Sequence, residues 1–85
     1  MIKVTEQEVL EVIRNTLSLQ KDTLTIESGA HNIEAWDSLG HLGILSALDK
    51  LFNGEIAPMK EVAAADSVSI ILQLLDKHSL IDTKK

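Results

Sequence analysis

Apolar residues in this chain recur at spacings of three and four over three stretches, at about 5–20, 38–52 and 67–78. This spacing puts the apolar side chains on one face of an α-helix. A shorter stretch, 58–64, begins with a proline, which suits the first turn of a helix. Strand patterns are almost absent. We therefore predict an all-α fold, a small antiparallel four-helix bundle of three long helices and one short helix with a long first loop.

Length and composition limit the chain to a single domain. Its 85 residues are fewer than the average of about 100–150 for a domain, and too few for the deep two-lobed cleft of most enzymes. Apolar residues make up 45% and charged residues 25%, as is typical of a globular domain rather than a disordered segment. We expect the core to span about 5–78 and the tail, 79–85, to be flexible.

Polar residues are predicted to start the three long helices. Thr5 and Glu8 have the S/T-x-x-E spacing of a capping box, in which each side chain bonds to the backbone N–H of the other residue. Asp37 is a good N-cap for the second long helix, and either Asp66 or Ser67 suits the last one. These signals set where the helices begin.

The second long helix is predicted to direct one apolar row at the core. The row consists of Leu39, Leu42, Leu45, Leu48 and Phe52. Ile44 and Leu51 broaden this row. After it, Asn53 and Gly54 are expected to end the helix, because glycine readily adopts the left-handed conformation found just past helix ends.

A long connection, 21–36, precedes this helix. A loop of that length without structure of its own is unusual in a small domain. We expect four apolar side chains to hold it against the helices, namely Leu24, Ile26, Ile33 and Trp36. Trp36 is predicted to be a loop anchor whose indole N–H finds one hydrogen-bond partner.

The charge and the side-chain inventory exclude several classes of function. The net charge of −5 argues against nucleic acid and anionic membrane surfaces, which bind basic proteins. The chain has no cysteine, so disulfides, thiolate metal ligands and a cysteine nucleophile are excluded. His31 and His78 lack the spacing of metal ligands, and we expect both at the surface with no metal bound. Signal-peptide and membrane-spanning patterns are missing, so we expect a cytoplasmic monomer that does not insert into membranes.

The most informative stretch is 36–42, which reads WDSLGHL. Ser38 falls at the first position of the second long helix, directly after the cap Asp37. This position exposes the hydroxyl group and points the positive end of the helix dipole at whatever is attached to it. A phosphate there would be favoured electrostatically. Leu39 is expected to clamp the helix start and to fix how Ser38 is presented.

A family resemblance follows from this stretch and its surroundings. The triplet Asp37-Ser38-Leu39, set after a long loop and at the start of an amphipathic helix, resembles the phosphopantetheine attachment site of acyl carrier proteins. The run LGHLGILSALDKLFNGEI resembles the second helix of this family and its exit. The entry to the last helix, DSV at 66–68, is similar as well. The resemblance extends over roughly 5–75, nearly the whole chain.

The resemblance implies a carrier rather than an enzyme. A phosphopantetheinyl transferase would move phosphopantetheine from coenzyme A to the Ser38 oxygen, and Asp37 would help to present the serine to this Mg-dependent enzyme. The thiol of the arm would hold acyl groups as thioesters. Acyl-loading and acyl-processing enzymes of fatty-acid, polyketide or related biosynthesis would be the partners. An aminoacyl or peptidyl carrier, or another specialised carrier, would use the same arm.

Two other classes of function remain open. Asp37 and Ser38 are also common helix-start residues, which suits a helical interaction module without a cofactor. Ser38 with His41 would form the dyad of a minimal serine hydrolase. The chain lacks the G-x-S-x-G elbow, however, and a pair on one helix has no evident oxyanion hole or third member. We expect His41 to face solvent or a partner instead.

A partner-docking surface is expected along the second long helix. Its candidate residues are Gly40, His41, Gly43, Ser46, Asp49 and Lys50. Acyl carrier proteins usually expose several acids along this helix, whereas this surface is mostly small and neutral. We therefore expect partners to dock less by charge. Close approach of a partner and tight packing within the fold explain the two glycines equally well.

Overall fold

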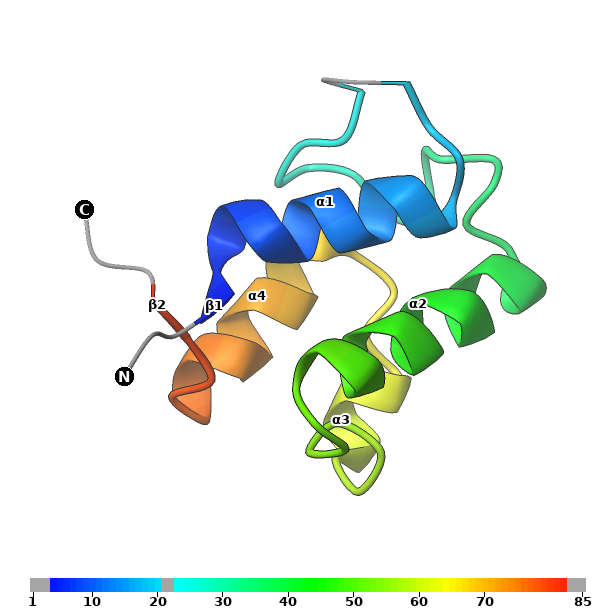
Figure 1. Cartoon of the computed structure of the whole chain (residues 1–85). Coiled ribbons are helices and arrows are strands. Elements are labelled where there is room, and N and C mark those ends of the chain that lie inside the picture. Colours follow the sequence, from blue (N-terminus) through cyan, green and yellow to red (C-terminus); the bar gives the residue numbers. More distant parts are fainter. Residues whose placement is uncertain (1–3, 21–22, 83–85) are drawn as a thin grey trace.

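The structure is a computed structural model that describes residues 4–20 and 23–82. This part of the chain forms a small, mostly helical protein with four helices, three of them longer than seven residues (Figure 1). The helices are α1 (Glu6–Thr16), α2 (Ser38–Leu51), α3 (Lys60–Ala63) and α4 (Val68–Lys77). Within the described residues, no helix has both the length and the apolar character needed to cross a membrane.

The three long helices begin where the capping signals predict. Thr5 Oγ1 accepts a hydrogen bond from the N–H of Glu8 at 3.2 Å, and Glu8 Oε1 accepts one from the N–H of Thr5 at 3.0 Å. Asp37 caps α2, and Ser67 rather than Asp66 caps α4. Each cap satisfies a backbone N–H that has no partner inside its helix. The predicted starts of these helices are therefore confirmed.

Two helices are shorter than predicted. α1 ends at Thr16, because Ser18 adopts the left-handed conformation with φ of 56°. The N–H of Leu19 then turns back to the carbonyl of Arg14 at 3.0 Å, which satisfies a carbonyl at the helix end. α3 begins at Lys60, two residues later than the predicted stretch.

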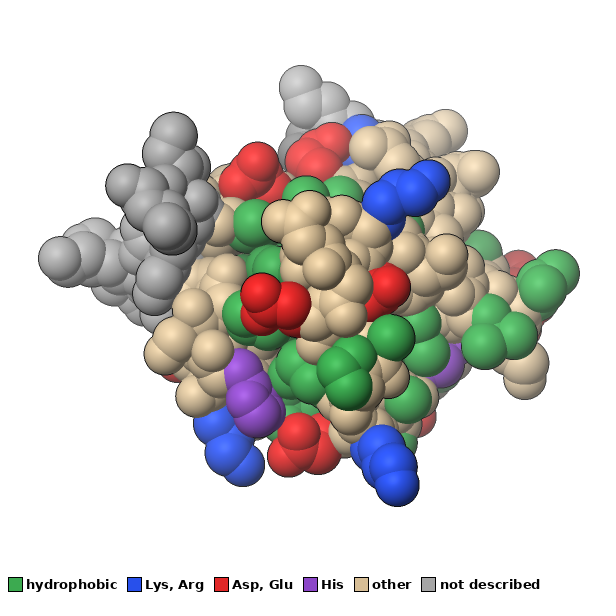
Figure 2. All heavy atoms as spheres, turned by 60° about the horizontal axis from the view of Figure 1, so that its bottom comes forward, with side chains coloured by type: hydrophobic (Ala, Val, Ile, Leu, Met, Phe, Trp, Pro, Cys, Tyr) green, Lys and Arg blue, Asp and Glu red, His purple; other side chains and the backbone are tan. Residues whose placement is uncertain are grey.

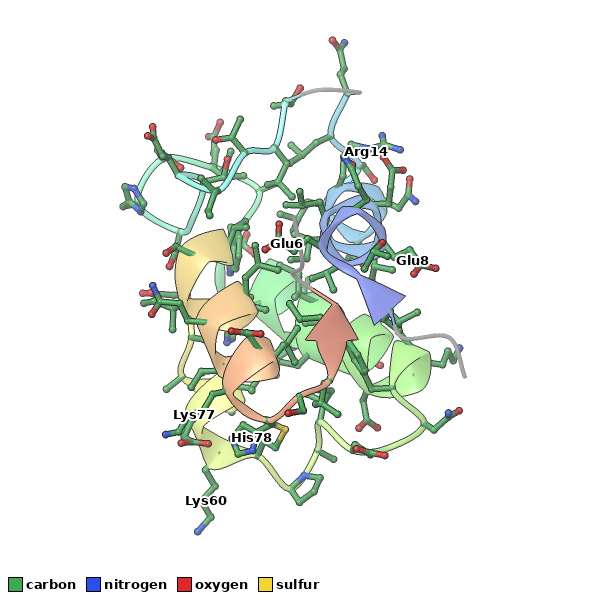
Figure 3. All side chains as sticks on the ribbon, turned by 90° about the vertical axis from the view of Figure 1, so that its left-hand side faces the viewer. Glu6, Glu8, Arg14, Lys60, Lys77 and His78 are labelled. Atoms are coloured by element: carbon green, nitrogen blue, oxygen red, sulfur yellow. The ribbon has the colours of Figure 1, made fainter. Side chains whose placement is uncertain are left out.

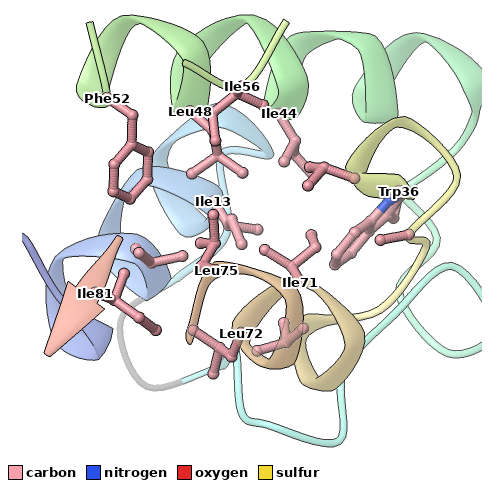
Figure 4. Packing of buried hydrophobic residues seen from close by; sticks show 14 of the residues in the cluster. Ile13, Trp36, Ile44, Leu48, Phe52, Ile56, Ile71, Leu72, Leu75 and Ile81 are labelled. Atoms are coloured by element: carbon pink, nitrogen blue, oxygen red, sulfur yellow. The ribbon is translucent and has the colours of Figure 1, made fainter. Parts of the chain in front are cut away.

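All four helices contribute side chains to one hydrophobic core (Figure 4). The most completely buried are Val9, Ile13, Ile44, Leu48, Val62, Val68, Ile71 and Leu75. Trp36, Phe52, Ile56 and Ile81 add to this core, each at most 6% exposed. Burying one such side chain completely stabilises the fold by about 1.5–3 kcal/mol. The core therefore supplies most of the favourable free energy of folding.

The apolar row predicted for α2 is wrong in its first half. Ile44 and Leu48 are fully buried, whereas Leu39 is 78% exposed and Leu42 is 63% exposed. At about 100° of rotation per residue, Leu42 lies about 200° around the helix from Ile44 and therefore on the opposite side. The predicted end of the helix is confirmed, since Gly54 adopts a φ of 85°.

The connection between α1 and α2 is held to the core largely as predicted. Trp36 is buried, and Leu24 and Ile33 are partly buried against the core cluster. Ile26 departs from the prediction, because its side chain is 55% exposed. Trp36 is thus the anchor that brings the end of this connection to the start of α2.

An antiparallel bridge that the sequence did not indicate ties this connection to α4. The N–H of Ala30 donates to the carbonyl of Asp66, and the N–H of Val68 donates to the carbonyl of Ser28, both at 2.9 Å. Gly29 lies between these bonds, where a Cβ atom would stand 2.8 Å from the Asp66 carbonyl oxygen. Only glycine permits this approach. The bridge brings Asp66 close to the residues that precede α2.

A second unpredicted pairing joins the two ends of the described chain. The strands β1 (Val4–Thr5) and β2 (Ile81–Asp82) pair in parallel. The side chain of Ile81 is 2% exposed and belongs to the core. The flexible tail predicted for 79–85 is therefore wrong as far as β2, because the chain there is paired and packed. Residues 83–85 lie outside the described residues.

Candidate functional site

The candidate site is centred on Ser38, the first residue of α2. Its side chain is exposed, as predicted. Asp37 is the N-cap of α2. Its Oδ1 accepts a hydrogen bond from the N–H of Gly40, and its carbonyl oxygen accepts one from the N–H of His41, both at 2.8 Å. A group joined to the Ser38 oxygen would therefore lie at an ordered helix end whose dipole is positive.

A hollow of about 330 Å³ opens beside Ser38. Its lining consists of Ala30, Trp36, Asp37, Ser38, His41 and Asp66. These residues come from the long connection, the first turn of α2 and the segment before α4. The two carboxylates, Asp37 and Asp66, give the hollow an acidic character. It has room for a small part of a flexible arm or for the approach of a partner's side chain.

His41 differs from its prediction. We expected a side chain that faces solvent or a partner, but His41 is half-buried and both of its ring nitrogens have partners. The indole Nε1–H of Trp36 donates to His41 Nδ1 at 3.1 Å, and His41 Nε2 lies 2.7 Å from the carbonyl oxygen of Ala63. The predicted role of Trp36 as an anchor with one hydrogen-bond partner is confirmed.

The side of α2 next to Ser38 exposes hydrophobic side chains. Leu39 and Leu42 protrude from it, and Figure 2 shows hydrophobic atoms at the right-hand end of the molecule, where α2 begins. Leu39 also lines a second hollow, of about 360 Å³, together with Leu17, which caps the end of α1, and Ala35 of the connection. The sequence predicted that Leu39 clamps the helix start. In the structure its side chain instead presents apolar surface beside the serine.

The two interior glycines of α2 are explained by packing within the fold. A Cβ atom on Gly40 would overlap the carbonyl oxygen of Ala35 and lie 3.0 Å from Leu17 Cδ2. On Gly43 it would lie 3.1 Å from Thr16 Cγ2 of α1. Both glycines thus allow close contact of α2 with neighbouring segments. Of the two explanations that the sequence left open, the structure favours tight packing.

The six predicted docking residues do not form one exposed stripe. Asp49 is turned toward the connection after α2, where its Oδ1 accepts the N–H groups of Ile56 at 3.1 Å and Ala57 at 2.8 Å. Ser46 and Lys50 are the members whose side chains are exposed. The other four members, Gly40, His41, Gly43 and Asp49, are half-buried, because each lies against another segment of the fold.

The other two histidines lie at the surface, as predicted. His31 is exposed in the connection, and His78 follows α4 next to Lys77 (Figure 3). His78 Nε2 lies 3.3 Å from Glu61 Oε1. Among the described residues, no group of three or more histidine or acidic side chains is arranged to hold a metal ion.

Sequence reasoning missed two residues of the site. Leu42 had a usable signal, because it follows Leu39 by three positions and therefore shares its side of the helix. Asp66 had none, because the bridge at Gly29 brings it to the hollow from a distant part of the chain.

Comparison with known proteins assigns no family to this chain. No protein-family model, curated protein or solved structure matches it. The interpretation of the site therefore rests on its residues and their geometry.

Proposed function

We propose that this protein is an acyl carrier protein whose Ser38 bears phosphopantetheine. The observation that carries the proposal is an exposed serine at the first position of a long helix, with Asp37 as its cap and Leu39 after it. The Ser38 oxygen would lose its proton and form a new phosphodiester bond, while the pyrophosphate bond of coenzyme A breaks and adenosine 3′,5′-bisphosphate leaves. The resulting phosphate sits at the positive end of α2, which stabilises its charge.

The cofactor would supply the chemistry that the chain lacks. The sequence has no cysteine, so the thiol that holds acyl groups as thioesters comes from the arm alone. The overall arrangement is in keeping with an antiparallel carrier bundle with a long first loop, since α1 and α2 run in opposite directions across Figure 1. The cargo is an acyl group in this proposal, and an aminoacyl group would use the same arm and the same serine.

Partners would meet the carrier at the apolar side of α2. A phosphopantetheinyl transferase, and later the acyl-loading and acyl-processing enzymes, must all reach Ser38. Leu39 and Leu42 are the exposed leucines beside it, and apolar contacts of this kind dominate the centre of protein interfaces. This surface supports docking by hydrophobic contact more than by charge.

The geometry argues against a serine hydrolase. A general base for Ser38 needs a free ring nitrogen to take the hydroxyl proton. The two ring nitrogens of His41 are directed at Trp36 and Ala63 and not at the Ser38 hydroxyl. A helical interaction module without a cofactor remains the competing class, and it makes no use of the Ser38 hydroxyl.

The test is the intact mass of the protein after incubation with coenzyme A and a permissive transferase. We expect the gain of one phosphopantetheine group in the wild type and no gain in Ser38→Ala. Ser46→Ala is the matched control, because Ser46 is an exposed serine on the same helix, and it should gain the group as the wild type does. If no transferase modifies the wild type, the carrier proposal is wrong and the interaction module stands.

A further inference from the structure

One side chain joins three segments of the molecule next to Ser38. His41 belongs to the first turns of α2, its Nδ1 bonds to Trp36 at the end of the long connection, and its Nε2 bonds to Ala63 at the end of α3. The Trp36 and His41 rings also stack, with centroids 6.4 Å apart and planes inclined by 24°. Trp36 is 2% exposed, and among the described residues His41 Nδ1 is the hydrogen-bond partner of its indole N–H.

These contacts determine which protons the His41 ring carries. An indole N–H can only donate and a carbonyl oxygen can only accept. His41 Nδ1 must therefore be an unprotonated acceptor for Trp36, and Nε2 must carry the proton that it donates to Ala63. This is one of the two neutral tautomers. A protonated ring has N–H groups at both positions and faces the indole N–H of Trp36 with a donor against a donor.

We propose that His41 is a pH-sensitive latch that holds Trp36 and α3 against the start of α2 when neutral and releases Trp36 when protonated. The contact to Ala63 survives protonation, because Nε2 remains a donor. The release therefore concerns Trp36 and the connection that it anchors.

The charged groups around His41 come from three segments of the chain. Asp37 from the cap of α2 and Asp66 from the segment before α4 line the same hollow as His41. On α3, Lys60 is exposed, and Glu61 is directed to Lys77 at 3.8 Å and to His78 at 3.3 Å. Protonation would change the role of Nδ1 from acceptor to donor beside a hollow that both carboxylates also line.

The chain itself offers a direct reporter of the latch. Trp36 is the sole tryptophan of the sequence, so both the fluorescence and the indole NMR signal of the protein come from this one ring. Between about pH 8 and pH 5, we expect a single transition in which the emission of Trp36 falls and its indole proton signal moves upfield as the hydrogen bond is lost. The transition should disappear in His41→Gln.

Matched variants separate His41 from the other histidines. His31→Gln and His78→Gln should keep the full transition, because neither side chain lines the hollow. Trp36 signals that do not change with pH in the wild type would overturn the latch. A transition that persists unchanged in His41→Gln, or that disappears in His31→Gln or His78→Gln, would overturn it as well.

A second measurement needs no variant and so does not depend on the folding of His41→Gln. The ¹⁵N shifts of an imidazole ring distinguish a nitrogen that carries a proton from one that does not. In the wild type at about pH 8, we expect His41 to be protonated at Nε2 and not at Nδ1. Protonation at Nδ1 would overturn the proposal.

The latch also has a consequence for Ser38 that rests on the proposed carrier function. Wild type and His41→Gln are mixed in one tube with coenzyme A and transferase, and one mass spectrum measures the modified fraction of each. Because both proteins meet the same enzyme, its own pH dependence does not affect the ratio of the two rates. At about pH 8 we expect the wild type to be modified about 2- to 12-fold faster than His41→Gln, which corresponds to the free energy of one hydrogen bond. At about pH 5 the two rates should be equal. An equal ratio at both pH values would overturn the link to Ser38. Failure to modify either protein would contradict the carrier function, and the Trp36 transition would then decide the latch alone.

Discussion

The helix α2 carries apolar side chains on two sides with opposite environments. Ile44 and Leu48 are 0% exposed in the core, whereas Leu39 and Leu42 are 78% and 63% exposed on the other side. The buried pair is accounted for by the fold. The exposed pair is not, because a leucine side chain that stays in water contributes little to folding. Side chains of similar chemistry on one helix thus serve stability on one side and, in our proposal, recognition on the other.

The largest effect is expected on the buried side. Leu48→Ala or Ile44→Ala should lower the free energy of unfolding by about 2–5 kcal/mol, because each leaves a cavity in a core that cannot fully close. For a domain of this size that is a large part of the total stability. Chemical denaturation followed by circular dichroism measures the change. A loss as small as that of a surface substitution would contradict the division between the two sides.

The next effect concerns the glycines of α2, Gly40 and Gly43, where the helix lies against neighbouring segments. Gly40→Ala should destabilise the protein by about 1–3 kcal/mol, because the added Cβ overlaps the carbonyl oxygen of Ala35. Gly43→Ala is the matched control, since its Cβ meets only the methyl end of Thr16 and the gain in helix propensity offsets the contact. Thermal melting of the two variants should rank Gly40→Ala well below Gly43→Ala. Equal melting temperatures would show that the close approach at Gly40 does not constrain the fold.

The exposed side should show the reverse behaviour. Leu39→Ala and Leu42→Ala should change stability by no more than about 0.5 kcal/mol, as is usual for surface positions. Each should nevertheless slow the modification of Ser38 by about fivefold or more, because a partner loses an apolar contact next to the serine. Initial rates from intact mass measure this. Modification at the wild-type rate in both variants would contradict the proposal that partners contact the exposed leucines of α2.

The smallest effect is expected from salt. Raising the ionic strength from about 50 mM to about 500 mM screens exposed charge pairs but leaves apolar contacts in place. We expect the affinity for a partner enzyme to fall by less than about threefold over this range. Lys50→Ala should be equally neutral, because that side chain lies at the other end of α2 from Ser38. A steep fall with salt would show that docking depends on charge after all.

Local signals in the sequence predicted much of the fold and the centre of the site. Each of these signals acts within a few residues, so a short stretch of sequence contains all the groups involved. They are the capping box at Thr5, the cap at Asp37 and the left-handed glycine at Gly54. The position of Ser38 at an exposed helix start follows from the same local chemistry.

The remaining features depend on partners that are distant in the chain. α2 is apolar around much of its circumference, so periodicity alone did not decide which side the core would cover, and Leu39 was assigned to the wrong one. The contact of His41 with Ala63 spans 22 positions, and the bridge at Gly29 joins the connection to α4. No local pattern encodes such contacts, because they arise only when the helices pack.

The pairing of β1 with β2 has a practical consequence for handling this protein. In Figure 1 the two strands lie at the left of the molecule, whereas α2 begins at the far right. A dye, an affinity handle or a linker to a solid support that is attached at β1 or β2 is therefore remote from Ser38. A layer of molecules immobilised through that end would present its serines outward, which makes the same preparation usable for both modification and binding measurements.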